Sequence, residues 1–305
     1  MLESEAKIKA ILPYFGGKRT MAPLVVQELG KHTQYFELCC GSAAVLFAKE
    51  QSQKETIIDL HGDLIHLAMV VQSDQAPELY NKLQQVILCE PLLNQARQYL
   101  EAADPPEPPV ICVERAFWYF LASWMGRNGT AGTKRQDYQI AVRWTNSGGS
   151  PTVRWRNAVE SLPWWHQRLQ NVVILKRDLF AIAHKFEDSP KTAIYADPPY
   201  TAETRGDQRN GRGGTYLHEF NHTSSLLEHD DHTRLRDVLA GYKKARIVVS
   251  YYDHPRIREL YKGWTFVECS RQKNLARQNG NGTEHGEAPE VLIINGPSYS
   301  QGGFA

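Results

Sequence analysis

The stretch YFELCCGSAAV, residues 35–45, indicates the fold: an apolar run ends in a turn of small residues, and a helix-like segment follows. A second apolar run ends at Asp59, 19 residues after Cys40. A strand, a tight turn, a helix and an acid at the end of the next strand make a nucleoside-binding layout, in which the acid accepts hydrogen bonds from ribose hydroxyls. An acidic strand end also occurs in α/β folds with a purely structural role, so this segment alone leaves both interpretations open.

The turn itself does not resemble a phosphate-binding loop. Gly41 is its single glycine, and the GxGxxG pattern of a dinucleotide site is missing. A ribose-bearing ligand without phosphates, such as S-adenosylmethionine, therefore fits better. The neighbouring Cys39 and Cys40 are interpreted as packing residues rather than a redox pair, since small buried thiols suit a tight turn.

Seven short β-rich runs recur along the chain, and helix-like segments at 42–50, 230–239, 253–261 and from Gly62 onward separate several of them. Most runs are continuously apolar, as expected for strands that are covered on both faces. The alternation predicts an α/β fold with a parallel or mixed sheet. The predicted strands are QYFELCC (34–40), TIIDL (56–60), NVVILKRD (171–178), AIYAD (193–197), RIVVSYY (246–252), TFVECS (265–270) and EVLIIN (290–295).

Residues 65–168 interrupt this alternation with helical runs, such as ERAFWYFLASWM, and with glycine-bearing loops. Between Arg115 and Arg168, eight basic residues stand against two acidic ones, an excess of +6 in a chain of net charge +1. Six of the seven tryptophans lie in the same stretch. Such an excess is expected of a phosphate-binding surface. A small aromatic core with a solvated basic face would give the same pattern.

Composition excludes several classes of protein. No apolar run approaches the roughly 20 residues of a membrane helix, and the charged N-terminus lacks the apolar stretch of a signal peptide. The five cysteines form no CxxC pair, so we expect a cytoplasmic protein without a disulfide framework or a zinc module. Four clustered histidines suggest a metal site, but their irregular spacing argues against one, and either of the first two is an alternative DNA contact. The four are His218, His222, His229 and His232.

The motif DPPY, residues 197–200, ends the predicted strand AIYAD and suits methyl transfer to an exocyclic amine of a base. That nitrogen is a poor nucleophile because its lone pair is conjugated with the ring. A carboxylate from Asp197 and the carbonyl of Pro198 can accept its hydrogens and free the lone pair. Pro199 has no N–H and holds Pro198 extended, while Tyr200 offers a flat face to a base taken out of its stack. Alone, DPPY is also compatible with a simple turn.

A series of motifs in the same order resembles the DNA adenine-N6 methyltransferases of the bacterial and phage Dam type (D12 class, alpha group). The resemblance covers nearly the whole chain and implies a Rossmann-like, S-adenosylmethionine-dependent enzyme with a mixed, mostly parallel seven-stranded sheet. It implies double-stranded DNA as the partner, no metal, no membrane, and a monomer or weak dimer. The matching motifs are PYFGGK (13–18), FELCCGSAAV (36–45), IIDLHGDLIHL (57–67), RDLF (177–180), DPPY (197–200), VVSYYD (248–253) and EVLIIN (290–295).

The resemblance also implies roles for individual residues. Asp59 would bind the ribose, Asp178 would lie near the cofactor adenine, and Tyr200 would hold the flipped target adenine. The cofactor-binding residues would be Tyr14, Lys18, Glu37, Cys39, Gly41, Asp59, Asp178, Leu179 and Asp197. Catalysis would fall to Asp197, Pro198, Pro199 and Tyr200. Residues 1–64 and 169–305 would form the catalytic domain, and 65–168 an inserted, mainly helical target-recognition domain that contacts DNA through Arg127, Asn128, Lys134, Arg135 and Arg143.

The chain departs from the family pattern at several positions. Cys39 occupies the place of a phenylalanine, Ala43 that of a second glycine, and His61 that of an asparagine. The arginine- and glycine-rich loop after DPPY, residues 201–216, is also longer than expected. Three alternatives remain open at this point: methylation of cytosine N4, methylation of RNA, and a DNA-binding decoy or repressor that has lost catalysis.

Overall fold

A computed structural model describes residues 6–14, 16–126, 140, 150–201, 217–218, 220, 230–269 and 289–302. All seven predicted strands are present, with ends within two residues of those predicted from the sequence. They are β1 (Gln34–Leu38), β2 (Lys54–Asp59), β3 (Val172–Lys176), β4 (Thr192–Ala196), β5 (Arg246–Tyr252), β6 (Thr265–Cys269) and β7 (Glu290–Ile294).

The strands form one mixed sheet in the order β3-β2-β1-β4-β5-β7-β6. The first five strands in this order run parallel, and β7 is antiparallel to both β5 and β6. This confirms the predicted mixed, mostly parallel α/β sheet. Because β1 lies between β2 and β4, the chain changes direction across the sheet at β1, and ligands of such folds bind at the carboxyl ends of the strands at this point.

Helices cover both faces of the sheet. They are α1 (Ala22–Leu29), α2 (Ala44–Ala48), α3 (Gly62–Gln72), α4 (Ala76–Gln84), α5 (Glu90–Ala102), α6 (Val113–Met125), α7 (Pro151–Leu169), α8 (Asp231–Ala240) and α9 (Pro255–Leu260), with short 3₁₀ turns η1 (Leu179–Ala181) and η2 (Ala183–Lys185). Side chains alternate between the two faces along each strand. Ile57 and Val248 therefore join the core beneath α1 to α7, while Ile58 and Val249 join the core beneath α8 and α9.

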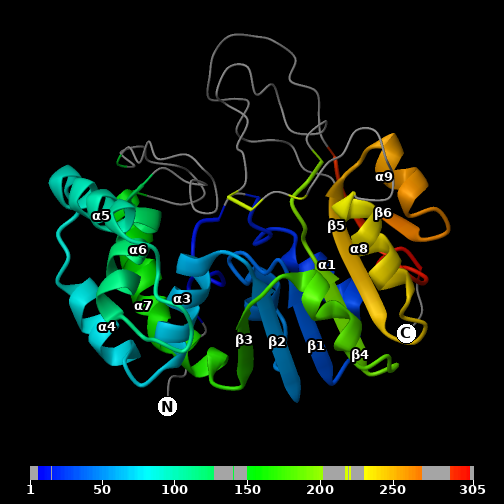
Figure 1. The fold of residues 1–305 in the computed structure, drawn as a ribbon, viewed down its shortest axis with the longest axis horizontal. Coiled ribbons are helices and arrows are strands. Elements are labelled where there is room, and N and C mark those ends of the chain that lie inside the picture. The colour runs from blue at the N-terminus through cyan, green and yellow to red at the C-terminus, as the bar shows by residue number, and fades with distance from the viewer. Residues whose placement is uncertain are drawn as a thin grey trace, which may run out of the picture.

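Helices α4 to α7 lie together at one side of the sheet, beyond β3 (Figure 1). They share a hydrophobic core with α3 and with one face of the sheet. That core contains Trp124, Trp155 and Trp165, so three of the tryptophans are packing residues. The boundary predicted at residue 64 falls within α3, and the division of the chain into two domains stays a prediction.

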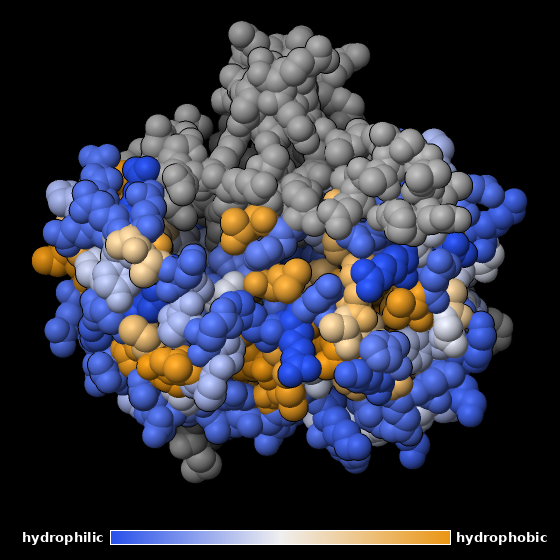
Figure 2. All heavy atoms as spheres, viewed as in Figure 1, coloured by the Kyte–Doolittle hydropathy of each residue, from blue (hydrophilic) through white to orange (hydrophobic). Residues whose placement is uncertain are grey.

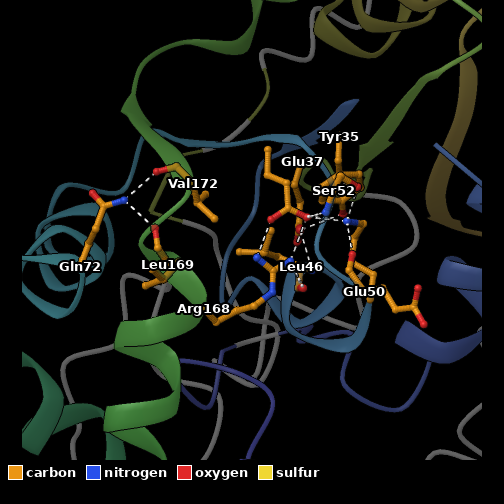
Figure 3. Close-up of polar contacts among 11 residues, drawn as sticks. Tyr35, Glu37, Leu46, Glu50, Ser52, Gln72, Arg168, Leu169 and Val172 are labelled. Carbon is orange, nitrogen blue, oxygen red and sulfur yellow. Dashed lines mark hydrogen bonds and ion pairs between the residues drawn. The ribbon is translucent and has the colours of Figure 1, made fainter. Parts of the chain in front are cut away.

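Two arginines of the basic stretch attach these helices to their surroundings. Arg115, on α6, donates two hydrogen bonds to the carboxylate of Asp63 on α3. Arg168, near the end of α7, donates to both oxygens of the buried Glu55 on β2 and to the carbonyl of Leu46 on α2. Figure 3 shows the Arg168 side chain pointing from α7 toward Leu46. Both arginines are buried, so they stabilise the fold and do not belong to a DNA-binding surface.

On the face seen in Figure 2, hydrophilic residues predominate and hydrophobic residues form small patches among them. The exposed large hydrophobic residues include Ile87, after α4, and Val173, on β3, which belong to separate parts of the fold. Among the described residues, no helix is long and apolar enough to cross a membrane.

Candidate active site

A pocket opens at the carboxyl ends of β1, β2 and β4, where the strand order predicts a ligand site. All nine predicted cofactor-binding residues line it, together with Pro198 and Pro199. The structure thus brings together residues that are far apart in the chain, such as Tyr14 and Asp197, which are separated by 183 positions. The roles of the individual residues stay predictions.

The turn between β1 and α2 has an unusual backbone. Cys39, Gly41 and Ala43 have φ angles of 54°, 48° and 53°, in the left-handed region that favours glycine. This geometry explains why a glycine suits the position of Ala43, and it shows that this chain places an alanine there despite the strain. At Gly41 a Cβ atom would lie 3.1 Å from Cδ1 of Tyr14, so the absence of a side chain also lets the aromatic ring approach the turn.

Asp59 connects this turn to the next helix. One of its carboxylate oxygens accepts a hydrogen bond from the Gly41 amide, and the other accepts from the His61 amide, each at 2.9 Å. His61 then caps α3, because its Nδ1 accepts from the Leu64 amide at 3.3 Å. Each oxygen of Asp59 keeps a second lone pair, which can accept a hydrogen bond from a ligand hydroxyl.

Asp178 and Leu179 line the pocket beyond the end of β3. Asp178 is exposed, and its Oδ1 accepts a hydrogen bond from the Phe180 amide at the start of η1. Leu179 is buried and lines the pocket with its apolar side chain. An exposed acid beside an apolar surface offers both a hydrogen-bond acceptor and a packing face to a ligand.

Glu37 is a buried acid in the wall of the pocket. Its Oε2 accepts hydrogen bonds from the Tyr35 hydroxyl, at 2.8 Å, and from the Leu46 amide, at 2.9 Å (Figure 3). Burial raises the pKa of Glu37 to about 8, although both hydrogen bonds oppose the rise. Glu37 is therefore largely protonated at neutral pH, and it can ionise when a cationic ligand binds beside it.

Asp197 lies at the end of β4, between a cation and a hydroxyl. Its Oδ1 is 3.0 Å from Nζ of Lys18 and accepts a 2.6 Å hydrogen bond from Ser250 on β5. Burial raises the pKa of Asp197 above its usual range, and Lys18 and Ser250 limit the rise. Lys18 is itself buried, which favours its neutral form, but Asp197 and Glu290 outweigh this effect and raise its pKa. Lys18 therefore stays protonated and favours the ionised form of Asp197.

Tyr200, the last residue of the DPPY motif, is buried beside the same cation. Its hydroxyl donates to Glu290 at 3.2 Å, and Nζ of Lys18 lies 4.8 Å from the centre of its ring. The ring of Tyr252 packs edge-on against it at 4.6 Å. Unlike the other three residues of the motif, Tyr200 does not line the pocket, and its exposed fraction is 2%.

Comparison with family models gives a match over residues 14–275 to the D12 class N6 adenine-specific DNA methyltransferases. The chain belongs to this family. The match spans the turn after β1, Asp59 and the DPPY motif, so the pocket is the expected active site of a DNA adenine methyltransferase.

Two further comparisons add little about the methyltransferase. No curated protein matches the chain. Among solved structures, a precorrin 8w decarboxylase from Methanobacterium thermoautotrophicum is 11% identical, with a TM-score of 0.33, and the match covers 92% of this chain and 89% of that chain. A similarity at this level carries no argument about fold or activity.

The charge of the pocket indicates which ligand the methyltransferase can hold. Four carboxylic acids line it, Glu37, Asp59, Asp178 and Asp197, against the basic residues Lys18 and Arg177. Even without Glu37, which is largely protonated at neutral pH, the acids outnumber these bases by three to two. An excess of acids disfavours a polyphosphate and favours a ligand that carries positive charge and hydroxyl groups. S-adenosylmethionine, with a sulfonium, an ammonium group and a ribose, fits this set of side chains.

The hydrogen-bond and ion-pair partners around Asp197 and Lys18 were not predicted from the sequence: Ser250, Tyr195 and Glu290. Each is a polar residue within or at the start of an apolar strand, and each is buried. Buried polar groups need hydrogen-bond partners. A hydroxyl in AIYA or VVSYY and an acid before VLII were therefore detectable signals that the strand assignment alone did not use.

Other predicted residues give a mixed result. His218 lies at the pocket, whereas His232 is fully buried with its Nδ1 2.8 Å from the Tyr251 hydroxyl. His222, His229 and the predicted DNA contacts Arg127, Asn128, Lys134, Arg135 and Arg143 lie outside the described residues. Within the described ranges, no group of three or more metal-ligating side chains is placed to hold a metal ion.

Cys39 and Cys40 are free thiols, and burial raises the pKa of both, which makes them weak nucleophiles.

Proposed function

We propose that the protein flips a target adenine out of double-stranded DNA and transfers a methyl group to its N6 from S-adenosylmethionine. The observation that carries this proposal is the position of Asp197. Its carboxylate stands in the wall of an acid-lined pocket, beside a protonated Lys18, at the strand end where the family carries its DPPY motif. The same pocket therefore offers a cofactor site and an acceptor for an amine.

The residues of the pocket divide the work between binding and activation. Asp59 accepts hydrogen bonds from the ribose, and the apolar face of Leu179 packs against the adenine of the cofactor. Glu37 lies beside the methionine portion. Asp197 and the carbonyl of Pro198 accept the two hydrogens of the target amine, which releases its lone pair from conjugation with the ring.

When bound, S-adenosylmethionine supplies an electrophilic methyl group on a positively charged sulfur. The N6 lone pair of adenine forms the new N–C bond while the S–C bond breaks and its electron pair remains on sulfur. One N6 proton then leaves by way of the Asp197 carboxylate to solvent. Positioning and electrostatics account for the rate, with no covalent intermediate on the protein.

Tyr200 is proposed to hold the flipped adenine. Since its ring is 2% exposed in this structure, stacking on the base requires the ring to become accessible when DNA binds. Residues 65–168 are proposed as the target-recognition domain, and residues 1–64 and 169–305 as the catalytic domain. We also propose that the enzyme acts as a monomer or weak dimer in the cytoplasm of a bacterium, encoded by the cell or by a phage.

Labelled methyl transfer tests the function. The protein is incubated with S-adenosylmethionine carrying a labelled methyl group and with unmethylated duplex DNA, single-stranded DNA or RNA. The products are digested to nucleosides and separated by chromatography. We expect the label in N6-methyl-2′-deoxyadenosine from duplex DNA.

The alternatives give different products. Label in N4-methylcytosine would support a cytosine enzyme, and label that is released by ribonuclease alone would indicate an RNA substrate. Binding of cofactor and DNA without any labelled nucleoside would contradict the proposed catalysis and support a decoy or repressor.

A further inference from the structure

The two oxygens of the Asp197 carboxylate have different surroundings. Oδ1 is held by two groups of the protein, the hydroxyl of Ser250 at 2.6 Å and the ammonium of Lys18 at 3.0 Å. Within the part of the chain that the structure describes, no hydrogen bond to Oδ2 is found. The side chain lines the pocket and is 21% exposed, so Oδ2 is the oxygen that remains for a ligand.

A second hydroxyl orients the first. The Tyr195 hydroxyl lies 3.1 Å from Oγ of Ser250, and both side chains are buried between β4 and β5. A serine hydroxyl has one proton, and an ionised carboxylate can only accept. Ser250 therefore gives its proton to Asp197, and Tyr195 must be the donor to Ser250. The result is a directed chain of hydrogen bonds from Tyr195 through Ser250 to Oδ1.

We propose that Ser250, oriented by Tyr195, is a positioning residue for methyl transfer: by fixing Oδ1 it directs Oδ2 at the amine of the target adenine. Lys18 alone does not supply this orientation, because an ammonium group is a point charge on a flexible stem. The hydroxyl sits on a central strand of the sheet and is rigid. This inference rests on the proposed function for its substrate, but the contact itself can be measured without turnover.

The hydroxyl also affects the ionisation of Asp197. Burial raises the pKa of Asp197, Lys18 and the Ser250 hydrogen bond lower it, and Glu290 raises it. Removing the hydroxyl therefore raises the pKa of Asp197 further. The titratable and charged groups that face this carboxylate from the surrounding elements are Lys18, Glu37, Cys39, Tyr195 and Glu290.

Steady-state kinetics of Ser250→Ala test the role of the hydroxyl. We expect kcat to fall about tenfold or more, as for loss of a hydrogen bond to a charged group, with KM for DNA and for S-adenosylmethionine changed less than about twofold. The acid limb of the kcat–pH profile should move to higher pH by about one unit. Ser250→Thr, which keeps the hydroxyl, should restore most of the rate, and Tyr195→Phe should give a smaller loss in the same direction.

Ser161→Ala is a matched control, because Ser161 is a buried serine whose hydroxyl donates to the Asn157 carbonyl far from the pocket. It should lower stability without moving the pH profile. A kcat for Ser250→Ala within twofold of wild type would overturn the proposal. So would an equal fall in kcat in Ser250→Ala, Ser250→Thr and Ser161→Ala.

The pKa of Asp197 can be followed directly by carbon NMR of the protein with ¹³C-labelled aspartate, with Asp197→Asn used to assign the signal. We expect the pKa to be higher in Ser250→Ala than in wild type. An unmoved pKa overturns the role of Ser250, whatever the substrate. A wild-type protein that transfers no methyl group to DNA would instead overturn the proposed function, and the NMR titration would still decide whether Ser250 controls Asp197.

Discussion

Replacing Lys18 with methionine removes an ammonium ion that lies between two acids. Nζ is 3.0 Å from Oδ1 of Asp197 and 3.6 Å from Oε1 of Glu290, with side-chain exposures of 5%, 21% and 7%. Without the cation, at least one acid must be protonated in the folded protein. An aspartate in the unfolded chain has a pKa of about 3.9. Protonating it at a higher pH costs about 1.4 kcal/mol for each pH unit above that pKa, or about 4 kcal/mol at pH 7. This upper bound agrees with the roughly 3–5 kcal/mol lost when a buried ion pair is broken.

The loss depends on pH in a defined direction. In Lys18→Met, the acid that is protonated in the folded protein has a higher pKa there than in the unfolded chain. The destabilisation is therefore absent below the unfolded pKa and grows as the pH rises above it. The free energy of unfolding relative to wild type should fall by about 1.4 kcal/mol per pH unit between about pH 5 and pH 7. Urea unfolding at these two pH values measures it.

A control variant separates this effect from the general loss of a lysine. Lys262 pairs with Glu259 on the surface, with both side chains more than three-quarters exposed at 78% and 76%. Lys262→Met should therefore change stability by less than about 0.5 kcal/mol at either pH. A loss in Lys18→Met that is equal at both pH values, or under about 1 kcal/mol at pH 7, would refute the reasoning.

Two other substitutions test the pocket and its support. Gly41→Ala forces an alanine to φ 48° with its Cβ 3.1 Å from the Tyr14 ring, and we expect a roughly tenfold loss of cofactor affinity by calorimetry. Gly263→Ala, at φ 89° in open space, should lower stability and leave that affinity unchanged. Arg168→Met removes one of the two cations that contact the buried Glu55 and leaves Lys49 as the other, so urea unfolding should show a loss of no more than about 3 kcal/mol. Adding Glu55→Gln should not recover the loss, because the buried ammonium of Lys49 then loses its carboxylate partner, and a double variant as stable as wild type would contradict this account.

The sequence predicted the strands better than the connections between them. Continuous apolar runs mark strands that helices cover on both faces, and the sheet has this construction. Helix α1 was missed because its eight residues carry few signals besides a proline in the first turn. The antiparallel insertion of β7 between β5 and β6 was not predictable from apolar patterning, since strand order depends on long-range pairing.

Most of the predicted cofactor residues lie in or next to the ends of strands, where motif and chemistry coincide, and their roles stay predictions. All nine line one pocket. The support of Asp197 was missed because Ser250 contacts the carboxylate and Tyr195 contacts Ser250 across two strands, with Tyr195 and Ser250 separated by 55 positions, and no local pattern specifies that pairing. The basic stretch was only partly interpreted, because charge counting does not distinguish Arg115 and Arg168, which are buried against acids, from arginines that face solvent.

The central claim is that the ionised carboxylate of Asp197 accepts the amine of an adenine in DNA. The most direct measurement is the single-turnover rate of methyl transfer by Asp197→Asn on duplex DNA, with labelled S-adenosylmethionine and saturating enzyme. The substitution keeps the size of the side chain and removes its charge. We predict a rate lower by about 10²–10⁴-fold with DNA binding retained, as expected for the loss of an acceptor for the reacting group. A rate within a fewfold of wild type would contradict the account.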